Sequence, residues 1–197
     1  HECTYLDLGA NHAKTMSNTY MFYRFGARGI LVEANPLLLS ELKQERAGDL
    51  VLNLCIANRS HEIVDFYIMS GDGLSTIDYA YAKQCMEKDP TLEIVDTVHI
   101  ETISVSDLLK KYCPETPMLI NIDVEGNALD ILVQLDLQHR RPLIVVVETI
   151  PFAINIEPDK KNEEIVEYMR TVNYSEYAFT GINSIFIDND KFIKPER

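Results

Sequence analysis

The order of apolar segments along the chain is the feature that most restricts its fold. Short runs rich in aliphatic and β-branched residues alternate with longer segments whose apolar residues recur at helical spacing, and turn residues stand at the junctions. This alternation is typical of a mostly parallel β-sheet covered by helices. The run at residues 143–147 is almost purely aliphatic, as expected of a central strand buried on both faces. The predicted fold class is therefore α/β.

The same patterns give approximate bounds for the elements. Strands are predicted over residues 3–8, 29–33, 50–56, 62–69, 94–103, 118–123, 143–147, 174–179 and 184–187. Helices are predicted over residues 15–25, 37–46, 79–88, 104–112, 128–137 and 160–172. Ser104 is expected to cap its helix, with Asp107 as the partner in a capping box. The last two strands fit an antiparallel hairpin at one edge of the sheet.

The charge balance argues against a nucleic acid as partner. The chain has 18 Lys and Arg residues against 31 Asp and Glu residues, which gives a net charge of −13. Affinity for DNA or RNA comes mostly from basic side chains that neutralise phosphates. A small neutral or cationic ligand is compatible with this excess of acid.

Several features favour a cytoplasmic protein. No apolar run approaches the roughly 18 residues of a membrane span, and the start has no basic region followed by an apolar core, as a signal peptide would. The four cysteines form no C-x-x-C pair, so we expect buried free thiols and a reducing compartment. Position 1 is not Met, and we expect residues to precede it in the natural protein.

Four carboxylates are predicted at the carboxyl ends of strands. Asp7, Glu33, Asp123 and Glu148 each lie at or near such an end. In sheets of this kind, ligands bind in the crevice outside those ends. Since a buried unpaired carboxylate is costly, the four side chains are either solvated in a cleft or bind a ligand there.

The first loop indicates which nucleotide-like ligand fits. Gly9 stands where the backbone must approach a ligand closely, and Glu33 follows at a distance suited to ribose hydroxyls. A dinucleotide site needs further glycines to admit a pyrophosphate, and Asn11, Ala13 and Lys14 hold those places. The Asp7 carboxylate would repel a pyrophosphate but suits the amino and sulfonium groups of S-adenosylmethionine (SAM). SAM is favoured, and a nucleotide-dependent oxidoreductase is the weaker alternative.

Several segments, in this order and spacing, resemble the FkbM-type SAM-dependent methyltransferases. They are residues 7–11 (DLGAN), 17–20 (SNTY) with 22–23 (FY), 29–36 (GILVEANP), 73–76 (GLST), 122–126 (IDVEG), 147–148 (VE) and 180–186 (TGINSIF). The resemblance covers most of the chain. It implies a Rossmann-like class I methyltransferase sandwich, with a seven-stranded sheet whose last strand is antiparallel. It also implies O-methylation of a hydroxyl, often on a sugar or glycan precursor.

The resemblance further implies which residues hold the cofactor. The methionine end of SAM would lie against Asp7, Gly9 and Asn11, the ribose against Glu33, and the sulfonium beside Asp123. The other cofactor-binding positions implied are Ala34, Asn35, Ile56, Ala57 and Ser75. Many members of the family have a glycine at the position of Ala13, whose methyl group could narrow the cofactor loop.

The catalytic residues are expected among Asp123, Glu125 and Glu148. Glu125 is the first candidate for contact with the acceptor hydroxyl and Glu148 the second, because a positioned carboxylate with a raised pKa can take its proton. Alternatively, the three carboxylates share a Mg²⁺-type ion, or Glu125 only faces the positive end of a helix dipole. The predicted site contains no metal.

We expect residues 1–197 to form one methyltransferase domain, in which the segment from about residue 70 to residue 103 is an acceptor wall or lid. A SAM-binding domain without turnover is the alternative function. The sequence identifies neither the acceptor nor the oligomeric state.

Overall fold

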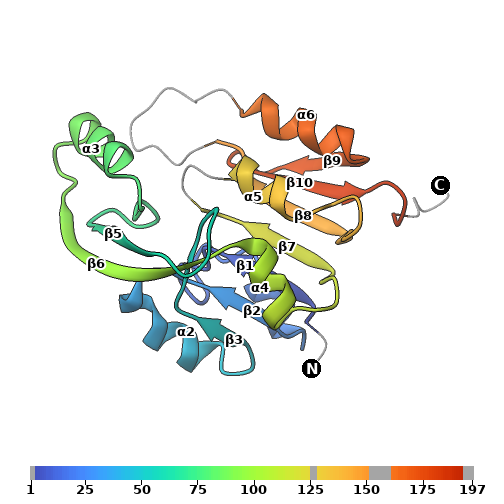
Figure 1. Cartoon of the computed structure of the whole chain (residues 1–197), viewed down its shortest axis with the longest axis horizontal. Coiled ribbons are helices and arrows are strands. Elements are labelled where there is room, and N and C mark those ends of the chain that lie inside the picture. Colours follow the sequence, from blue (N-terminus) through green and yellow to red (C-terminus); the bar gives the residue numbers. More distant parts are fainter. Residues whose placement is uncertain (1–2, 125–127, 151–160, 193–197) are drawn as a thin grey trace.

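The computed structural model describes residues 3–124, 128–150 and 161–192 (Figure 1). Within these residues, seven strands form one sheet in the order β3-β2-β1-β7-β8-β10-β9. From one edge to the other they are Leu50–Leu52 (β3), Gly29–Val32 (β2), Tyr5–Leu8 (β1), Leu119–Ile122 (β7), Ile144–Glu148 (β8), Asn183–Asp188 (β10) and Tyr174–Phe179 (β9). Strand β10 is antiparallel to both neighbours, while the pairs from β3 to β8 are parallel. The predicted α/β class, the mostly parallel seven-stranded sheet and the closing hairpin are confirmed.

Helices cover both faces of this sheet. One face carries Val105–Tyr112 (α4), Ala128–Gln134 (α5) and Glu163–Thr171 (α6), whose apolar residues pack with Leu6 and Leu8 of β1. The other carries Tyr20–Arg24 (α1) and Leu39–Glu45 (α2), which pack around Tyr5 and Leu31. Side chains alternate along each strand, so every central strand contributes to both cores. None of the helices in the described part of the chain is long and apolar enough to traverse a lipid bilayer.

The predicted strand at residues 50–56 is two strands in the structure. It breaks after β3, and Cys55–Ile56 (β4) pairs instead with Ile94–Ile103 (β6) of a second sheet. At the break, the Asn53 side chain donates to the backbone oxygens of Glu33 and Ala34 at 2.9 and 3.0 Å. This anchors the chain to the end of β2 and turns it out of the first sheet.

The second sheet has the order β4-β6-β5, and Ile63–Met69 (β5) is antiparallel to β6. Together with Tyr79–Lys88 (α3), β5 and β6 extend beyond the carboxyl ends of the main strands (Figure 1). The connection from β5 to α3 therefore lies over that edge of the main sheet.

The helix predicted at residues 15–25 is much shorter, because α1 begins at Tyr20. Met16 has a positive φ of 55°, outside the helical region, and the Ser17 hydroxyl accepts from the Tyr20 N–H at 3.2 Å. The Thr19 hydroxyl donates to Asp7 at 2.5 Å and caps nothing. Polar side chains before a helix can compete with its backbone hydrogen bonds in this way.

Other helix ends differ by smaller amounts. The helix predicted from residue 37 starts as a 3-10 turn, Pro36–Leu38, and α6 begins at Glu163, where Asn162 caps it. Ser104 caps α4 as predicted, accepting from the Asp107 N–H at 3.2 Å. The reciprocal half of the capping box is wrong, since the Ser60 hydroxyl accepts from the Ser104 N–H at 2.9 Å.

The face covered by α1 and α2 holds a buried ion pair. Arg46, just after α2, is 1% exposed, and its Nε donates to Asp49 at 2.9 Å. Its terminal nitrogens donate to the hydroxyls of Tyr5 and Thr19 at 2.9 and 3.0 Å, and to the backbone oxygen of Ala13 at 3.2 Å. One guanidinium thus joins β1, α2 and the loop that follows β1.

We predict that Arg46→Leu lowers the free energy of unfolding by about 3–5 kcal/mol, because it leaves the Asp49 carboxylate buried and without its cation. Arg59→Leu is the matched control, since Arg59 is 81% exposed and its ion pair with Glu62 is worth at most about 1 kcal/mol. Urea unfolding measures both. Equal stability of the two variants would contradict a central role for Arg46.

Candidate active site

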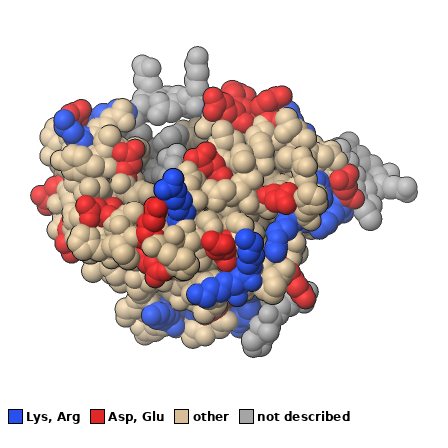
Figure 2. Space-filling view, viewed as in Figure 1, with Lys and Arg blue, Asp and Glu red and all other residues tan. Residues whose placement is uncertain are grey.

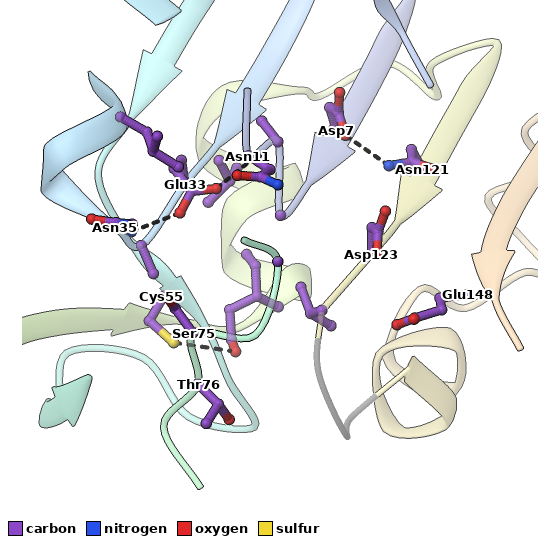
Figure 3. A pocket seen from close by; sticks show the side chains of 18 of the residues that line it. Asp7, Asn11, Glu33, Asn35, Cys55, Ser75, Thr76, Asn121, Asp123 and Glu148 are labelled. Atoms are coloured by element: carbon purple, nitrogen blue, oxygen red, sulfur yellow. Dashed lines mark hydrogen bonds between the residues drawn. The ribbon is translucent and has the colours of Figure 1, made fainter. Parts of the chain in front are cut away.

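A cavity of about 380 Å³ opens at the carboxyl ends of β1, β2, β7 and β8. Its lining includes the four carboxylates predicted at strand ends, Asp7, Glu33, Asp123 and Glu148. Figure 3 shows Glu33 and Asn35 on one side of this cavity and Asp123 and Glu148 on the other. The parallel order of the strands brings these side chains to one edge of the sheet, as the sequence predicts.

The loop after β1 lies against the end of β7 at Gly9. This residue has a φ of +79°, and a Cβ built on it would lie 1.9 Å from the backbone oxygen of Asp123. A side chain cannot be accommodated there without moving one of the two loops. Glycine at position 9 therefore sets how closely the ends of β1 and β7 approach.

Glu33 joins the first two loops of the cavity. Its carboxylate accepts from the backbone N–H groups of Asn11 at 2.8 Å and Asn35 at 2.7 Å. Burial raises the pKa of Glu33, and the two N–H donors act in the opposite direction. Each carboxylate oxygen keeps a lone pair for a further donor. Glu33 can therefore hold both loops and accept from a hydroxyl in the cavity.

Asp7 lies at the floor of the cavity and is only 1% exposed. Its oxygens accept from Thr19 Oγ1 at 2.5 Å and from Asn121 Nδ2 at 2.8 Å. Asn121 is its register partner on β7 and in turn accepts from the Asn18 side chain at 3.0 Å. Through Thr19 this chain of hydrogen bonds reaches Arg46. Asp7 therefore ties the cavity floor to the buried ion pair.

Asp123 follows β7, and Glu148 ends β8 beside it. Burial and the neighbouring Asp7 carboxylate raise the pKa of Asp123 to about 6. A carboxylate with such a pKa exchanges protons near neutral pH far more readily than an ordinary one. Glu148 pairs in register with Asn183 of β10, which also lines the cavity. The Asn183 Oδ1 is buried and has no hydrogen-bond partner among the described residues.

The wall near Glu33 is mostly apolar. Leu54, Cys55, Ile56 and Phe66 line it, and burial raises the pKa of the Cys55 thiol to about 11, so the thiol stays protonated. The segment between β5 and α3 completes the cavity with Gly73, Ser75, Thr76 and Ile77. The Ser75 hydroxyl accepts from the Met69 N–H at 3.1 Å. This half can hold a flat apolar ring beside a polar carboxylate.

Most residues predicted for the site line the cavity together. Besides the four carboxylates they are Gly9, Asn11, Ala34, Asn35, Ile56 and Ser75. Ala57 is not among the lining residues, because its N–H donates to Ile103 as the chain joins the second sheet. Glu125 lies outside the described residues.

The methyl group of Ala13 does not narrow the cavity. Ala13 is completely buried in the core with Tyr5, Leu31 and Leu42, and it is not among the residues that line the cavity. Its N–H donates to Glu41 at 3.0 Å. The expectation that this residue restricts the cofactor loop is therefore wrong.

Sequence reasoning missed several lining residues. Asn18 belongs to a segment that carries the family resemblance but was given no role, and Asn121 carries no motif, so only the strand register places Asn121 beside Asp7. Leu54, Cys55 and Phe66 read as ordinary strand residues. The odd polar residue in the apolar run 118–122 was a usable signal for Asn121.

The described lining contains carboxylates but no Lys, Arg or His side chain. Figure 2 shows acidic side chains over much of the surface as well, with fewer basic ones. The described residues hold no group of three or more His, Cys, Asp or Glu side chains that could bind a metal ion. The cavity therefore favours a ligand that is positively charged or neutral.

Comparison with known proteins gives one result. A search of curated proteins found no match. The model of the methyltransferase FkbM domain matches residues 7–176, which run from the end of β1 to beyond β8. Because this match spans most of the sequence, the chain belongs to the FkbM methyltransferase family.

Proposed function

We propose that this protein is a SAM-dependent O-methyltransferase that acts on a hydroxyl group of a sugar or glycan precursor. The observation that carries the proposal is the cavity itself, in which Glu33 and an apolar wall lie at one end and Asp123 and Glu148 at the other. In a methyltransferase family, these ends suit an adenosine group and a reacting centre. When bound, SAM supplies an electrophilic methyl group on a positively charged sulfur.

The residues present fit SAM. The cavity of about 380 Å³ lies within the range of small-molecule sites. Its carboxylates complement the sulfonium and ammonium charges, whereas the diphosphate of a nicotinamide dinucleotide would lie against like charge. The oxidoreductase alternative is therefore disfavoured.

The contacts support the following cofactor-binding roles. Glu33 is proposed to accept from ribose hydroxyls, with Ala34 and Asn35 beside it and Ile56 against the adenine. Asp7, Gly9 and Asn11 would hold the methionine end, and Asp7 acts largely by fixing the loop, since it is almost fully buried at the cavity floor and bonds to Thr19 and Asn121. Ser75 would contact the cofactor from the opposite wall. Ala57 is left out of the proposed set because it does not line the cavity.

Asp123 and Glu148 are proposed to act on the acceptor. Asp123 would lie beside the sulfonium, and Glu148 would orient the acceptor hydroxyl or take its proton. Alignment of an acceptor for in-line displacement can contribute several kcal/mol. Glu125, which lies outside the described residues, stays part of this proposal as a candidate for contact with the acceptor hydroxyl. A shared metal ion is not part of it.

We propose that residues 1–197 act as one methyltransferase domain and that the segment of about residues 70–103 forms an acceptor wall or lid. Its support is that Gly73, Ser75 and Thr76 line the cavity. The cytoplasmic location inferred from the cysteines stays a prediction. A SAM-binding protein without turnover is separated from an enzyme by the third experiment below.

We predict that Glu33→Ala weakens SAM binding about tenfold or more, because hydrogen bonds to a charged carboxylate are lost. Calorimetric titration with SAM measures this. Glu62→Ala, at a half-exposed surface carboxylate, is the control and should leave the affinity unchanged. Unchanged affinity in both Glu33→Ala and Asp7→Ala would refute the SAM site.

The preference for SAM over S-adenosylhomocysteine is predicted to increase as the pH rises through about 6, the raised pKa of Asp123. The sulfonium favours the ionised carboxylate, so the proton must leave before SAM binds at lower pH. The uncharged sulfur of S-adenosylhomocysteine has no such requirement. Titrations with both ligands at pH 5–8 measure the ratio of the SAM affinity to the S-adenosylhomocysteine affinity. Asp123→Asn should remove the pH dependence of this ratio. A ratio that is flat in the unmodified protein would place Asp123 away from the sulfur.

We predict transfer of labelled methyl groups from SAM to neutral methyl glycosides, with kcat/KM about tenfold or more above that for the matching uronic acids. The reason is that like charges face each other when a carboxylate approaches Glu148 and Asp123. Glu148→Gln should reduce this difference in kcat/KM between neutral glycosides and uronic acids. Tight SAM binding with no transfer to any glycoside would favour the protein without turnover, and a preference for uronic acids would contradict the charge argument.

A further inference from the structure

His12 in the loop after β1 lies between carboxylates from two other parts of the chain. Its Nδ1 is 2.9 Å from Glu41 Oε2 on α2, and its Nε2 is 3.3 Å from Asp72 Oδ2 in the turn after β5. The neighbouring Asn11 side chain donates to the other Asp72 oxygen at 3.2 Å. Three separate segments therefore meet at one imidazole ring.

Both contacts exist together only when the ring is protonated. An ionised carboxylate only accepts hydrogen bonds, and a neutral imidazole has one N–H. Loss of the proton therefore removes one of the two bonds and the charge attraction to both carboxylates.

The charged groups around the ring reinforce this protonation. Glu41 faces it from α2 and Asp72 from the turn, while Lys14 of the same loop pairs with Glu45. The hydrogen bond to Glu41 and the charge of Asp72 raise the pKa of His12, and partial burial acts in the opposite direction.

Asp72 belongs to the segment that completes the cavity. It lies next to Gly73, which lines the cavity together with Ser75 and Thr76. On the other side of the contact, the Asn11 N–H donates to Glu33. The His12 contacts thus join the proposed ribose-binding loop to the opposite wall.

We propose that His12 is a positioning residue, which as an imidazolium holds the wall at residues 71–77 against the cofactor loop and releases it on losing its proton. This inference rests on the proposed function, because the ligand that the closed wall retains is the methyl donor or its product. Glu41 holds the ring in place from α2, and Asp72 is the group that the ring retains.

In the structure His12 contacts both Glu41 and Asp72, and we call this the closed arrangement. The direction of the pH effect follows from the raised pKa of His12 in this arrangement. The contacts contribute fully below the ordinary histidine pKa of about 6.5, and are lost as the pH rises through the higher value of the closed arrangement. Ligand retention should therefore decrease on the alkaline side.

The test is the affinity and dissociation rate of S-adenosylhomocysteine between pH 6 and 9. This ligand lacks the sulfonium, so the effect of Asp123 is reduced. For the unmodified protein we expect affinity to fall about fivefold with rising pH, as partly exposed ion pairs are lost. His12→Gln should bind about fivefold more weakly at pH 6 and show no further fall. His99→Gln, which breaks an exposed pair with Asp65, should behave like the unmodified protein.

A second measurement does not depend on any ligand. In the ligand-free protein, the NMR titration of the His12 ring and the hydrogen-exchange protection of the Leu74 and Thr76 amides should change with one common midpoint. Their N–H groups bond to Gly71 and Tyr67 in the closed wall. In His12→Gln, the hydrogen-exchange protection of these two amides should be low at all pH values.

The outcomes separate the two proposals. No binding of SAM or S-adenosylhomocysteine at any pH refutes the proposed function, and the NMR titration still decides the role of His12. The role of His12 is overturned if the hydrogen-exchange protection of the Leu74 and Thr76 amides does not change as the His12 ring titrates. It is also overturned if His12→Gln lowers only the unfolding temperature and keeps the affinity and pH profile of the unmodified protein.

Discussion

The buried guanidinium of Arg46 is the constraint on which the rest of the site depends. A cation removed from water is tolerated only with an anion and further hydrogen-bond partners, and here Asp49, Tyr5, Thr19 and Ala13 supply them. These partners come from β1, from the loop after it and from the approach to β3. Satisfying one buried charge therefore fixes the positions of segments that are distant in sequence.

The same network extends to the cavity floor. Thr19 passes the hydrogen bonding from Arg46 to Asp7, and Asp7 continues it to Asn121 across the sheet. An isolated Asp7 carboxylate would be costly to bury, and its two donors offset that cost. Burial still raises the pKa of Asp7, although these donors act in the opposite direction. Burial, together with the Asp7 carboxylate, raises the pKa of Asp123. Fold stability and the electrostatics of the site thus share the same side chains.

Part of this arrangement could be predicted from local patterns, and part could not. The predicted strand at residues 50–56 is apolar except for Asn53, and it divides there because the Asn53 side chain finds backbone acceptors at the end of β2. The predicted helix at residues 15–25 has helical spacing, but the Thr19 hydroxyl is drawn to Asp7 instead. In both cases a polar side chain satisfies a partner that is distant in sequence, which no local pattern reveals.

The sequence by itself determined the α/β class, the closing hairpin and the four carboxylates at strand ends, because strand periodicity and parallel order place those ends at one edge. The motifs of residues 7–11, 29–36 and 122–126 also indicated the family that the domain match shows. Only the tertiary structure decided that Ala13 faces the core, that Asn121 supports Asp7, and that His12 reaches Asp72. The physical reason is that these contacts depend on the direction of each side chain and on partners from other segments, which are fixed only when the sheet and its loops pack.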